Sequence, residues 1–140
     1  MTSDYAAICL VCRDSVILSK RIKIYNGKPV NFGGYWSPFA GTIEEGETPK
    51  ECAIRELKEE SEFSIPPNKV FFQNLIKRKD NKYLAFFIGI LNEFPKIKLD
   101  YEHTEYNIFK FDELEKVKPL DKEIFKSLKK YYKNAITDKS

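Results

Sequence analysis

Three glutamates lie close together in the middle of the chain, at Glu56, Glu59 and Glu60. On an α-helix, where successive residues are about 100° apart, positions i, i+3 and i+4 share one face. Carboxylates on one face repel one another, and a divalent cation would remove that repulsion. Ligands that are all oxygen favour Mg²⁺ or Mn²⁺ over zinc. The spacing therefore indicates a metal-assisted phosphate site, with a solvated acidic helix face as the alternative.

The helix that carries these glutamates has a well-marked start in the sequence. Thr48 is a suitable N-cap, Pro49 fits the first helical position, and Glu51 completes a capping box. We therefore predict a helix over residues 49–61. A proline pair shortly afterwards prevents the helix from continuing.

Residues 41–63 resemble the Nudix box, the pattern G-x5-E-x7-R-E-U-x-E-E-x-G-U in which U is a bulky aliphatic residue. The positions that match in register are Gly41, Glu47, Arg55, Glu56, Leu57, Glu59 and Glu60. The chain departs from the pattern at Glu62, where the family has Gly, and Phe63 occupies the last U position. Without that glycine, we expect the helix to end differently, or Glu62 to add charge beside the site. Before the box, Phe39 stands where Pro is common, which changes the expected shape of the pocket.

The resemblance implies a fold and a reaction for the whole chain. The implied fold class is α/β, a Nudix-type α/β/α sandwich with a mixed β-sheet between helices, formed by residues 1–140 as a single domain. The implied reaction is hydrolysis of the diphosphate linkage of a nucleoside diphosphate derivative by water attack at phosphorus. Its implied cofactor is Mg²⁺, with Mn²⁺ as a substitute. The family also suggests a homodimer.

Two other interpretations stay open beside the enzyme. One is a non-catalytic, Nudix-like domain that senses a nucleotide. Degenerate domains of that kind usually lose box glutamates, whereas this chain retains them, so the enzyme is favoured. The other is a small structural or interaction protein with a fortuitous acidic helix. No further signature outside the box identifies which nucleoside diphosphate derivative would be the substrate.

By the same resemblance, Glu56 and Glu60 would bind the metal. Glu59 would bind it directly or through water, or help to activate water, and Ala40 would offer its backbone carbonyl. The candidates to accept a proton from water are Glu59, Glu56 and Glu102, and the spacing does not choose between them.

The resemblance also implies supporting roles around the site. An ion pair between Glu47 and Arg55 would hold the loop onto the helix, and a surface pair of little energetic consequence is the alternative. Gly41 belongs to the same supporting set. Its ordinary alternative use is a turn that needs a positive φ.

A second acidic segment lies downstream, where Glu102, His103 and Glu105 occur within four residues. Nudix enzymes often supply a further Glu from a loop in this region, as a metal ligand or as the base. Glu102 is the better positional match and Glu105 the second, with an ordinary polar loop as the alternative. His103 is the only histidine of the chain, and near pH 7 its ring is a candidate base.

Candidate substrate-binding residues precede the box. Arg21 lies between Lys20 and Lys23, and these cations are candidates to meet substrate phosphates. The aromatic candidates to stack a nucleobase, each with core packing as its alternative, are Tyr35, Trp36, Phe39 and Tyr106. We take Tyr35, Phe39 and Arg21 as the predicted substrate-binding set.

The remaining pattern predicts the elements that position these residues. Apolar runs bounded by turn residues predict strands over residues 5–11, 16–18, 70–77, 83–91 and 107–111. Residues 20–34 are rich in turn formers and predict a loop, and residues 35–40 predict an extended segment. Apolar residues at helical spacing predict a helix over residues 121–135, with its lysines on a solvated face.

Composition excludes several classes of protein. The 140 residues are 42% apolar and 14% aromatic, which is typical of one folded domain and too rich for a disordered chain. No apolar run approaches the roughly 20 residues of a membrane span, and a net charge of +3 is too small to indicate nucleic-acid binding. Three cysteines and a start without signal-peptide features predict free thiols in a reducing compartment. We therefore expect a cytoplasmic protein with a small-molecule partner.

Overall fold

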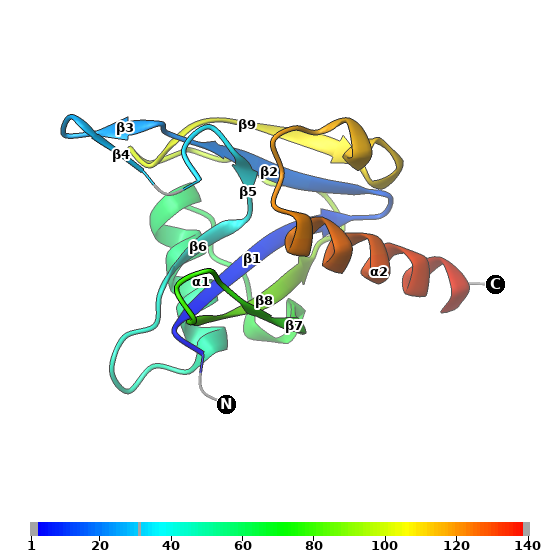
Figure 1. Ribbon diagram of the computed structural model, residues 1–140. Helices are drawn as coiled ribbons and strands as arrows, with labels where there is room; N and C mark the ends of the chain where they lie inside the picture. The colour runs from blue at the N-terminus through cyan, green and yellow to red at the C-terminus, as the bar shows by residue number, and fades with distance from the viewer. Residues whose placement is uncertain (1–2, 31, 139–140) are drawn as a thin grey trace.

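The computed structural model describes residues 3–30 and 32–138, and Figure 1 shows their arrangement. A mixed β-sheet lies between two helices, α1 (Pro49–Ser61) and α2 (Lys122–Asp138). The two helices pack into separate hydrophobic clusters on opposite faces of the sheet. This arrangement confirms the predicted α/β/α sandwich.

The central strand of the sheet is β1 (Tyr5–Cys12). It pairs in parallel with β8 (Tyr83–Ile90), which pairs antiparallel with β7 (Val70–Lys77). On its other side, β1 pairs antiparallel with two strands in turn: β6 (Phe39–Thr42) along its first half and β2 (Ser15–Arg21) at its end. The first residues of β6 lie close to the last turn of α1, where the Ala40 N–H donates to the carboxylate of Glu60.

The rest of the sheet extends from β2. Strand β9 (His103–Lys110) pairs antiparallel with β2 along nearly its whole length. The short elements are β3 (Ile24–Tyr25), β4 (Lys28–Pro29), β5 (Trp36–Ser37), and the 3₁₀ turns η1 (Pro67–Lys69) and η2 (Phe111–Lys116). Strands β3 and β4 form a separate hairpin after β2, and β5 pairs with β2.

Successive side chains of β1 point to opposite faces of the sheet, and each face carries one of the two hydrophobic clusters. Every residue from Ala6 to Val11 is at most 1% exposed, as expected of a strand covered on both faces. The side chains that pack toward α2 are Ala7, Cys9 and Val11, and those that pack toward α1 are Ala6, Ile8 and Leu10. The three cysteines are free, as predicted, and all three are buried.

The start of α1 is the predicted capping box. The hydroxyl of Thr48 accepts a hydrogen bond from the Glu51 N–H, and the Glu51 carboxylate accepts one from the Thr48 N–H. Pro49 occupies the first turn. The helix spans the predicted residues, because its capping signals are local to the sequence.

The end of α1 differs from the expectation. Glu62 itself takes the left-handed conformation, with φ 59° and ψ 14°, and its N–H donates to the carbonyl of Lys58 at 2.9 Å. The helix therefore ends as a glycine would end it, and the prediction of a different end is wrong. The carboxylate of Glu62 lies 3.7 Å from the ammonium of Lys98, an exposed ion pair.

Two predictions for polar segments are wrong in part. Residues 20–34 are not one loop, because β2 continues to Arg21 and the β3–β4 hairpin follows. Its turn is Asn26–Gly27, with φ of 53° and 77°, the conformation for which this dipeptide is favoured. Strand β9 begins at His103 and not at residue 107. Residues 104–108 are exposed, so this part of the strand shows no apolar run.

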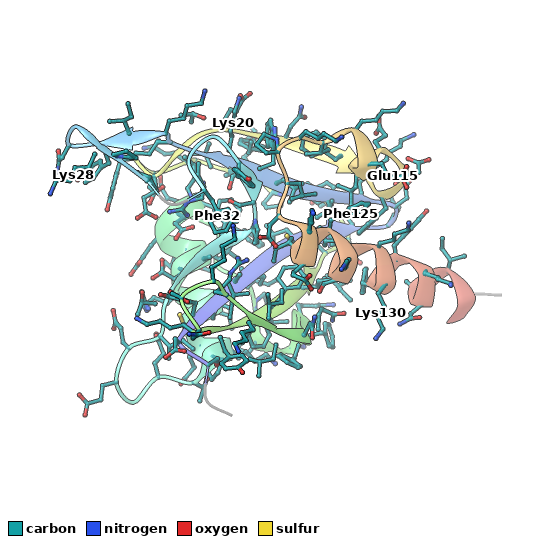
Figure 2. All side chains as sticks on the ribbon, viewed as in Figure 1. Lys20, Lys28, Phe32, Glu115, Phe125 and Lys130 are labelled. Carbon is teal, nitrogen blue, oxygen red and sulfur yellow. The ribbon has the colours of Figure 1, made fainter. Side chains whose placement is uncertain are left out.

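The C-terminal helix α2 covers the face opposite α1. Ile124 and Leu128 are buried beneath it, whereas its lysines are exposed as predicted, Lys130 in Figure 2 among them. Over residues 3–30 and 32–138, no helix has the length and apolar character needed to cross a bilayer.

Candidate active site

Arg55 of α1 holds the loop that precedes the helix. Its Nε and Nη2 atoms lie 2.7 and 3.0 Å from the two carboxylate oxygens of Glu47, which makes a bidentate ion pair. Its Nη1 atom donates to Glu56 Oε1 at 2.8 Å, and Nη2 donates to the carbonyl of Thr42 at 3.1 Å. The hydrogen bonds from Arg55 lower the pKa of Glu47 to about 2. The ion pair that the resemblance implies is thus formed, and it also restrains Glu56.

We expect Arg55→Lys to lower the free energy of unfolding by about 1–3 kcal/mol, because an ammonium cannot reproduce the fork toward Glu47 and Glu56. Urea denaturation followed by circular dichroism measures the change. Arg13→Lys, in an exposed turn, is the matched control and is expected to have no effect. Equal stability of the Arg55 variant and the parent would mean that the fork contributes nothing.

Gly41 of β6 faces the carboxylate of Glu56. A Cβ atom at residue 41 would overlap with Cδ and both carboxylate oxygens of Glu56. Gly41 lies within a strand and does not take a left-handed φ. Lack of space, and not a turn conformation, is therefore the reason for a glycine at this position.

Glu60, in the last turn of α1, is 1% exposed. Its Oε1 atom accepts a hydrogen bond from the Ala40 N–H at 3.2 Å and lies 3.1 Å from Nε2 of His103. Its Oε2 atom is buried and has no hydrogen-bond partner among the described residues. Because a buried polar atom without a partner is costly, Oε2 is the atom at this site that most needs a ligand.

The surroundings of Glu60 favour its protonated form. Burial is the main cause, and the nearby carboxylates of Glu56 and Glu102 add to it, so that the pKa rises to about 10. A bound cation would act in the opposite direction, because its charge stabilises the ionised carboxylate. The site is thus built at a cost that a cation would offset.

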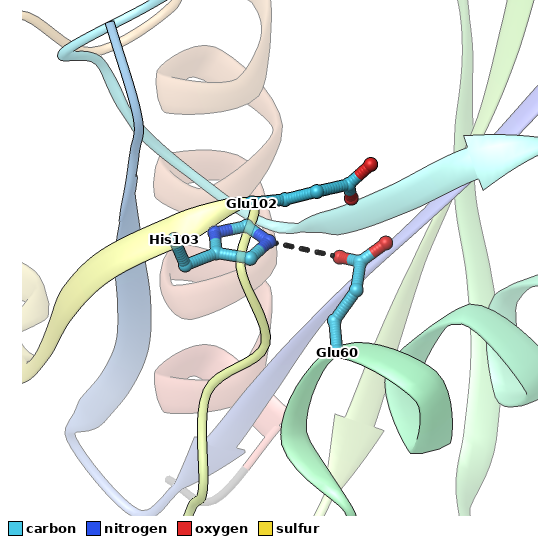
Figure 3. Close-up of side chains that lie close together, drawn as sticks. All are labelled: Glu60, Glu102 and His103. Atoms are coloured by element: carbon cyan, nitrogen blue, oxygen red, sulfur yellow. Dashed lines mark hydrogen bonds and ion pairs between the residues drawn. The ribbon is translucent and has the colours of Figure 1, made fainter. Parts of the chain in front are cut away.

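Three side chains meet where α1 ends and β9 begins. Figure 3 shows Glu60 from α1 facing Glu102, directly before β9, and His103, the first residue of β9. One possible ligand atom of each lies within 4.8 Å of the others. Burial and the charge of Asp100 raise the pKa of Glu102. The structure therefore brings Glu102 to the box helix, as predicted.

His103 is enclosed on both sides of its ring. Its Nδ1 atom lies 2.9 Å from Ser19 Oγ, its Nε2 atom contacts Glu60, and its side chain is 0% exposed. Burial, together with the charge of Arg21, lowers the pKa of His103 to about 4, so the ring is neutral at pH 7. A ring so enclosed does not face water, and we do not retain His103 as a candidate base.

Arg21 lies on the same face of the sheet as Glu102 and His103. It is paired with His103 across β2 and β9, and its charge opposes the rise in the pKa of Glu102. The register of β2 and β9 shifts between Lys20 and Arg21, so the pair before the shift faces the other side of the sheet. In that pair, Nζ of Lys20 lies 3.7 Å from Oε1 of Glu105. Of the two acids predicted downstream, only Glu102 therefore reaches the site.

Two of the predicted aromatic residues, Phe39 and Tyr35, pack against other side chains. Phe39 is 1% exposed and packs edge-on against His103 with ring centroids 5.4 Å apart, so no ligand can stack on it. Its prediction as a substrate-binding residue is corrected to a core residue. Tyr35 packs edge-on against Phe32, and the guanidinium of Arg78 covers Phe32 at 5.2 Å.

Two predicted metal-site residues, Glu59 and Ala40, have no observed contact among the described residues that indicates a ligand atom directed at the cluster of Glu60, Glu102 and His103. Glu59 is 55% exposed, and its carboxylate oxygens lie 3.3 Å from Nη1 of Arg55. Ala40 contacts Glu60 through its N–H. The carbonyl of Ala40 as a ligand stays a prediction.

Asp100 was missed in the sequence. Its carboxylate accepts a hydrogen bond from the Glu102 N–H at 3.1 Å, and its own N–H donates to the carbonyl of Glu60 at 3.1 Å. Burial raises its pKa. Asp100 therefore joins the loop before β9 to the end of α1, and an Asp two residues before a Glu was only a weak signal for this.

A pair of exposed tyrosines was also missed. The rings of Tyr25, in the hairpin, and Tyr101, beside Glu102, lie with centroids 5.0 Å apart and 30° between their planes. Tyr101 is 63% exposed, and the charge of Glu102 raises its pKa. The dipeptide Asn26–Gly27 was the available signal, because it predicts the hairpin that carries Tyr25.

Comparisons with known proteins agree with this architecture. A family model described as NUDIX domain matches residues 2–131 of the chain. A curated relative, an RNA pyrophosphohydrolase of a Nitratiruptor species, is 27% identical over 130 residues, which cover 81% of this chain and 84% of the relative.

Two solved structures have a similar fold. The Ap4A hydrolase of C. elegans, solved as a binary complex, has a TM-score of 0.74 at 18% identity, covering 95% of this chain and 98% of that one. The MutT protein of Methanosarcina mazei Go1 has a TM-score of 0.74 at 15% identity, covering 96% of each chain. At these identities the likeness concerns the fold alone.

Proposed function

Because the chain belongs to the Nudix hydrolase family, we propose that it uses a divalent cation to hydrolyse the diphosphate linkage of a nucleoside diphosphate derivative. The family and the named relative support a pyrophosphohydrolase. What the chain itself adds is a buried carboxylate whose Oε2 atom has no partner among the described residues, next to two further acids. That atom of Glu60 is the observation that carries the proposal.

The residues present fit a hard cation. Glu56, Glu60 and Glu102 would hold it, with Glu59 and the carbonyl of Ala40 as further oxygen donors. Oxygen donors favour Mg²⁺, with Mn²⁺ as a substitute. When bound, the ion would offset the charge of the phosphate oxygens and lower the pKa of a coordinated water.

The other residues of the site would orient the substrate and receive a proton. Arg21, on the face of the acids, would contact a phosphate. The carboxylate of Glu60 is enclosed, and Nη1 of Arg55 lies 2.8 Å from Glu56 but 3.3 Å from the more exposed Glu59. Glu59 and Glu102 are therefore the acids that we propose to accept a proton from water. Attack of that water at phosphorus breaks the anhydride bond and leaves two phosphorylated products.

The exposed pair of Tyr25 and Tyr101 indicates where a nucleobase of the substrate would bind. Tyr25 and Tyr101 lie at the edge of the acidic group, because Tyr101 precedes Glu102 in the chain. We propose that their exposed ring surface stacks a nucleobase while Arg21 and the acids meet the diphosphate. This pair takes the place that the sequence assigned to Tyr35 and Phe39. That residues 1–140 form one cytoplasmic domain, and pair as a homodimer, are further proposals.

A screen of nucleoside diphosphate derivatives with Mg²⁺ tests the function. It includes ADP-ribose, nucleotide sugars, dinucleoside polyphosphates and nucleoside triphosphates, and also an RNA with a polyphosphate end, because a relative is named for RNA. We expect phosphorylated products from at least one class, no reaction in chelator, and recovery with Mg²⁺ or Mn²⁺. With oxygen-18-labelled water, the label is expected in a phosphate product. Metal and nucleotide binding without any hydrolysis would instead support the nucleotide-sensing alternative.

A further inference from the structure

We propose that His103, held in place by Ser19, is a positioning residue that directs the free oxygen of Glu60 toward the cation. The inference rests on the proposed function, because it assumes that Glu60 binds a cation. It concerns a residue outside the box, and it explains why the only histidine of the chain is buried against an acid.

The two oxygens of Glu60 have different surroundings. Oε1 accepts the Ala40 N–H at 3.2 Å and lies 3.1 Å from Nε2 of His103, whereas Oε2 has no partner within residues 3–30 and 32–138. Two contacts on the same oxygen fix the rotation of the carboxylate about its last bond. Oε2 is therefore left as the oxygen available to a ligand.

His103 is itself restrained. Its Nδ1 atom lies 2.9 Å from the hydroxyl of Ser19 on β2, and the ring of Phe39 packs edge-on against the imidazole. A ring held on both sides offers its Nε2 at one position only. The line of contacts thus runs from Ser19 on β2 through the imidazole to Glu60 on α1.

A direct role of His103 as a metal ligand is the competing interpretation, because its nitrogen lies within 4.8 Å of the acidic oxygens. Both ring nitrogens are already engaged, however, one by Ser19 and the other by Glu60. A ligand nitrogen would have to release one of these contacts. The geometry therefore favours positioning over direct coordination.

Two amide substitutions of different length test the proposal. His103→Gln places its amide near the position of Nε2 and reaches Glu60, whereas His103→Asn places the same group near Nδ1 and reaches only Ser19. Calorimetric titration with Mn²⁺ is expected to show at least about tenfold weaker binding for the Asn variant and near-parental binding for the Gln variant. Ser19→Ala, which removes one hydroxyl, is expected to weaken binding by a smaller factor.

Thermal unfolding in chelator provides the structural readout. We expect the Asn and Gln variants to have similar melting temperatures, so that a difference in Mn²⁺ affinity reflects the position of Glu60. Equal affinity of both variants and of Ser19→Ala would overturn the proposal, and so would a directly coordinated nitrogen in pulsed electron paramagnetic resonance of the parent with Mn²⁺. If the parent itself bound no Mn²⁺, the proposed function would fail instead.

Discussion

Glu60→Gln is expected to lower kcat by at least about 100-fold, because the site loses the carboxylate oxygen that has no other partner among the described residues. Glutamine has nearly the same shape and keeps an acceptor for the Ala40 N–H, so the fold should be retained. Steady-state kinetics with the substrate identified in the screen, and titration with Mn²⁺, measure the two losses. Glu56→Gln is expected to have a comparable effect on kcat.

The same substitution is expected to stabilise the metal-free protein at neutral pH. The pKa of Glu60 is raised from an ordinary 4.5 to about 10, so its contribution to stability is fully present below pH 4.5 and is lost as the pH rises toward 10. The loss is at most about 1.4 kcal/mol per pH unit for one proton. Glu60→Gln removes this dependence. Chemical denaturation in chelator at several pH values should show a flatter profile for the variant.

Glu45→Gln is the matched control, because Glu45 is an exposed acid within the box. It is expected to change neither kcat nor the pH profile of stability. Parental activity in both Glu56→Gln and Glu60→Gln would refute the assignment of the site.

Gly41→Ala is expected to lower kcat by about 10- to 100-fold with little loss of stability. The added methyl would overlap with the carboxylate of Glu56, and that flexible group is displaced more easily than the strand. The hydrogen bond that Arg55 donates to Glu56 would then be lost or re-formed at another position. Kinetics, Mn²⁺ affinity and thermal unfolding together measure the effect.

Gly46→Ala is expected to show the opposite behaviour. Gly46 has a φ of +80° and nothing within 4 Å of an added Cβ, so alanine there should cost about 1–2 kcal/mol of stability through its backbone and leave kcat unchanged. An active Gly41 variant with reduced stability would show that Gly41 matters for the strand and not for Glu56.

The local parts of the site could be predicted from the sequence. Thr48, Pro49 and Glu51 predict the start of α1 through contacts within one turn, and the box spacing predicts the ion pair of Glu47 and Arg55 across that turn. Local reasoning left the use of Gly41 open. The expectation for Glu62 was wrong, because this non-glycine residue takes the left-handed conformation that glycine favours and still caps the helix.

The buried contacts among Ser19, Glu60 and His103 join distant parts of the chain. Glu60 and His103 are separated by 43 positions, and Ser19 and His103 by 84. The register shift between β2 and β9 decides that His103 and Glu105 face opposite sides of the sheet. Without that shift, residues two apart in a strand would share a face.

The sequence by itself determined the helix, its three glutamates and the family pattern, because these depend on helical period and spacing within about twenty residues. Only the tertiary structure decided that Glu60 is enclosed, that Glu102 and Arg21 join it, and that Phe39 belongs to the core. Burial and strand register arise when the sheet closes against α1, and a linear pattern does not contain them.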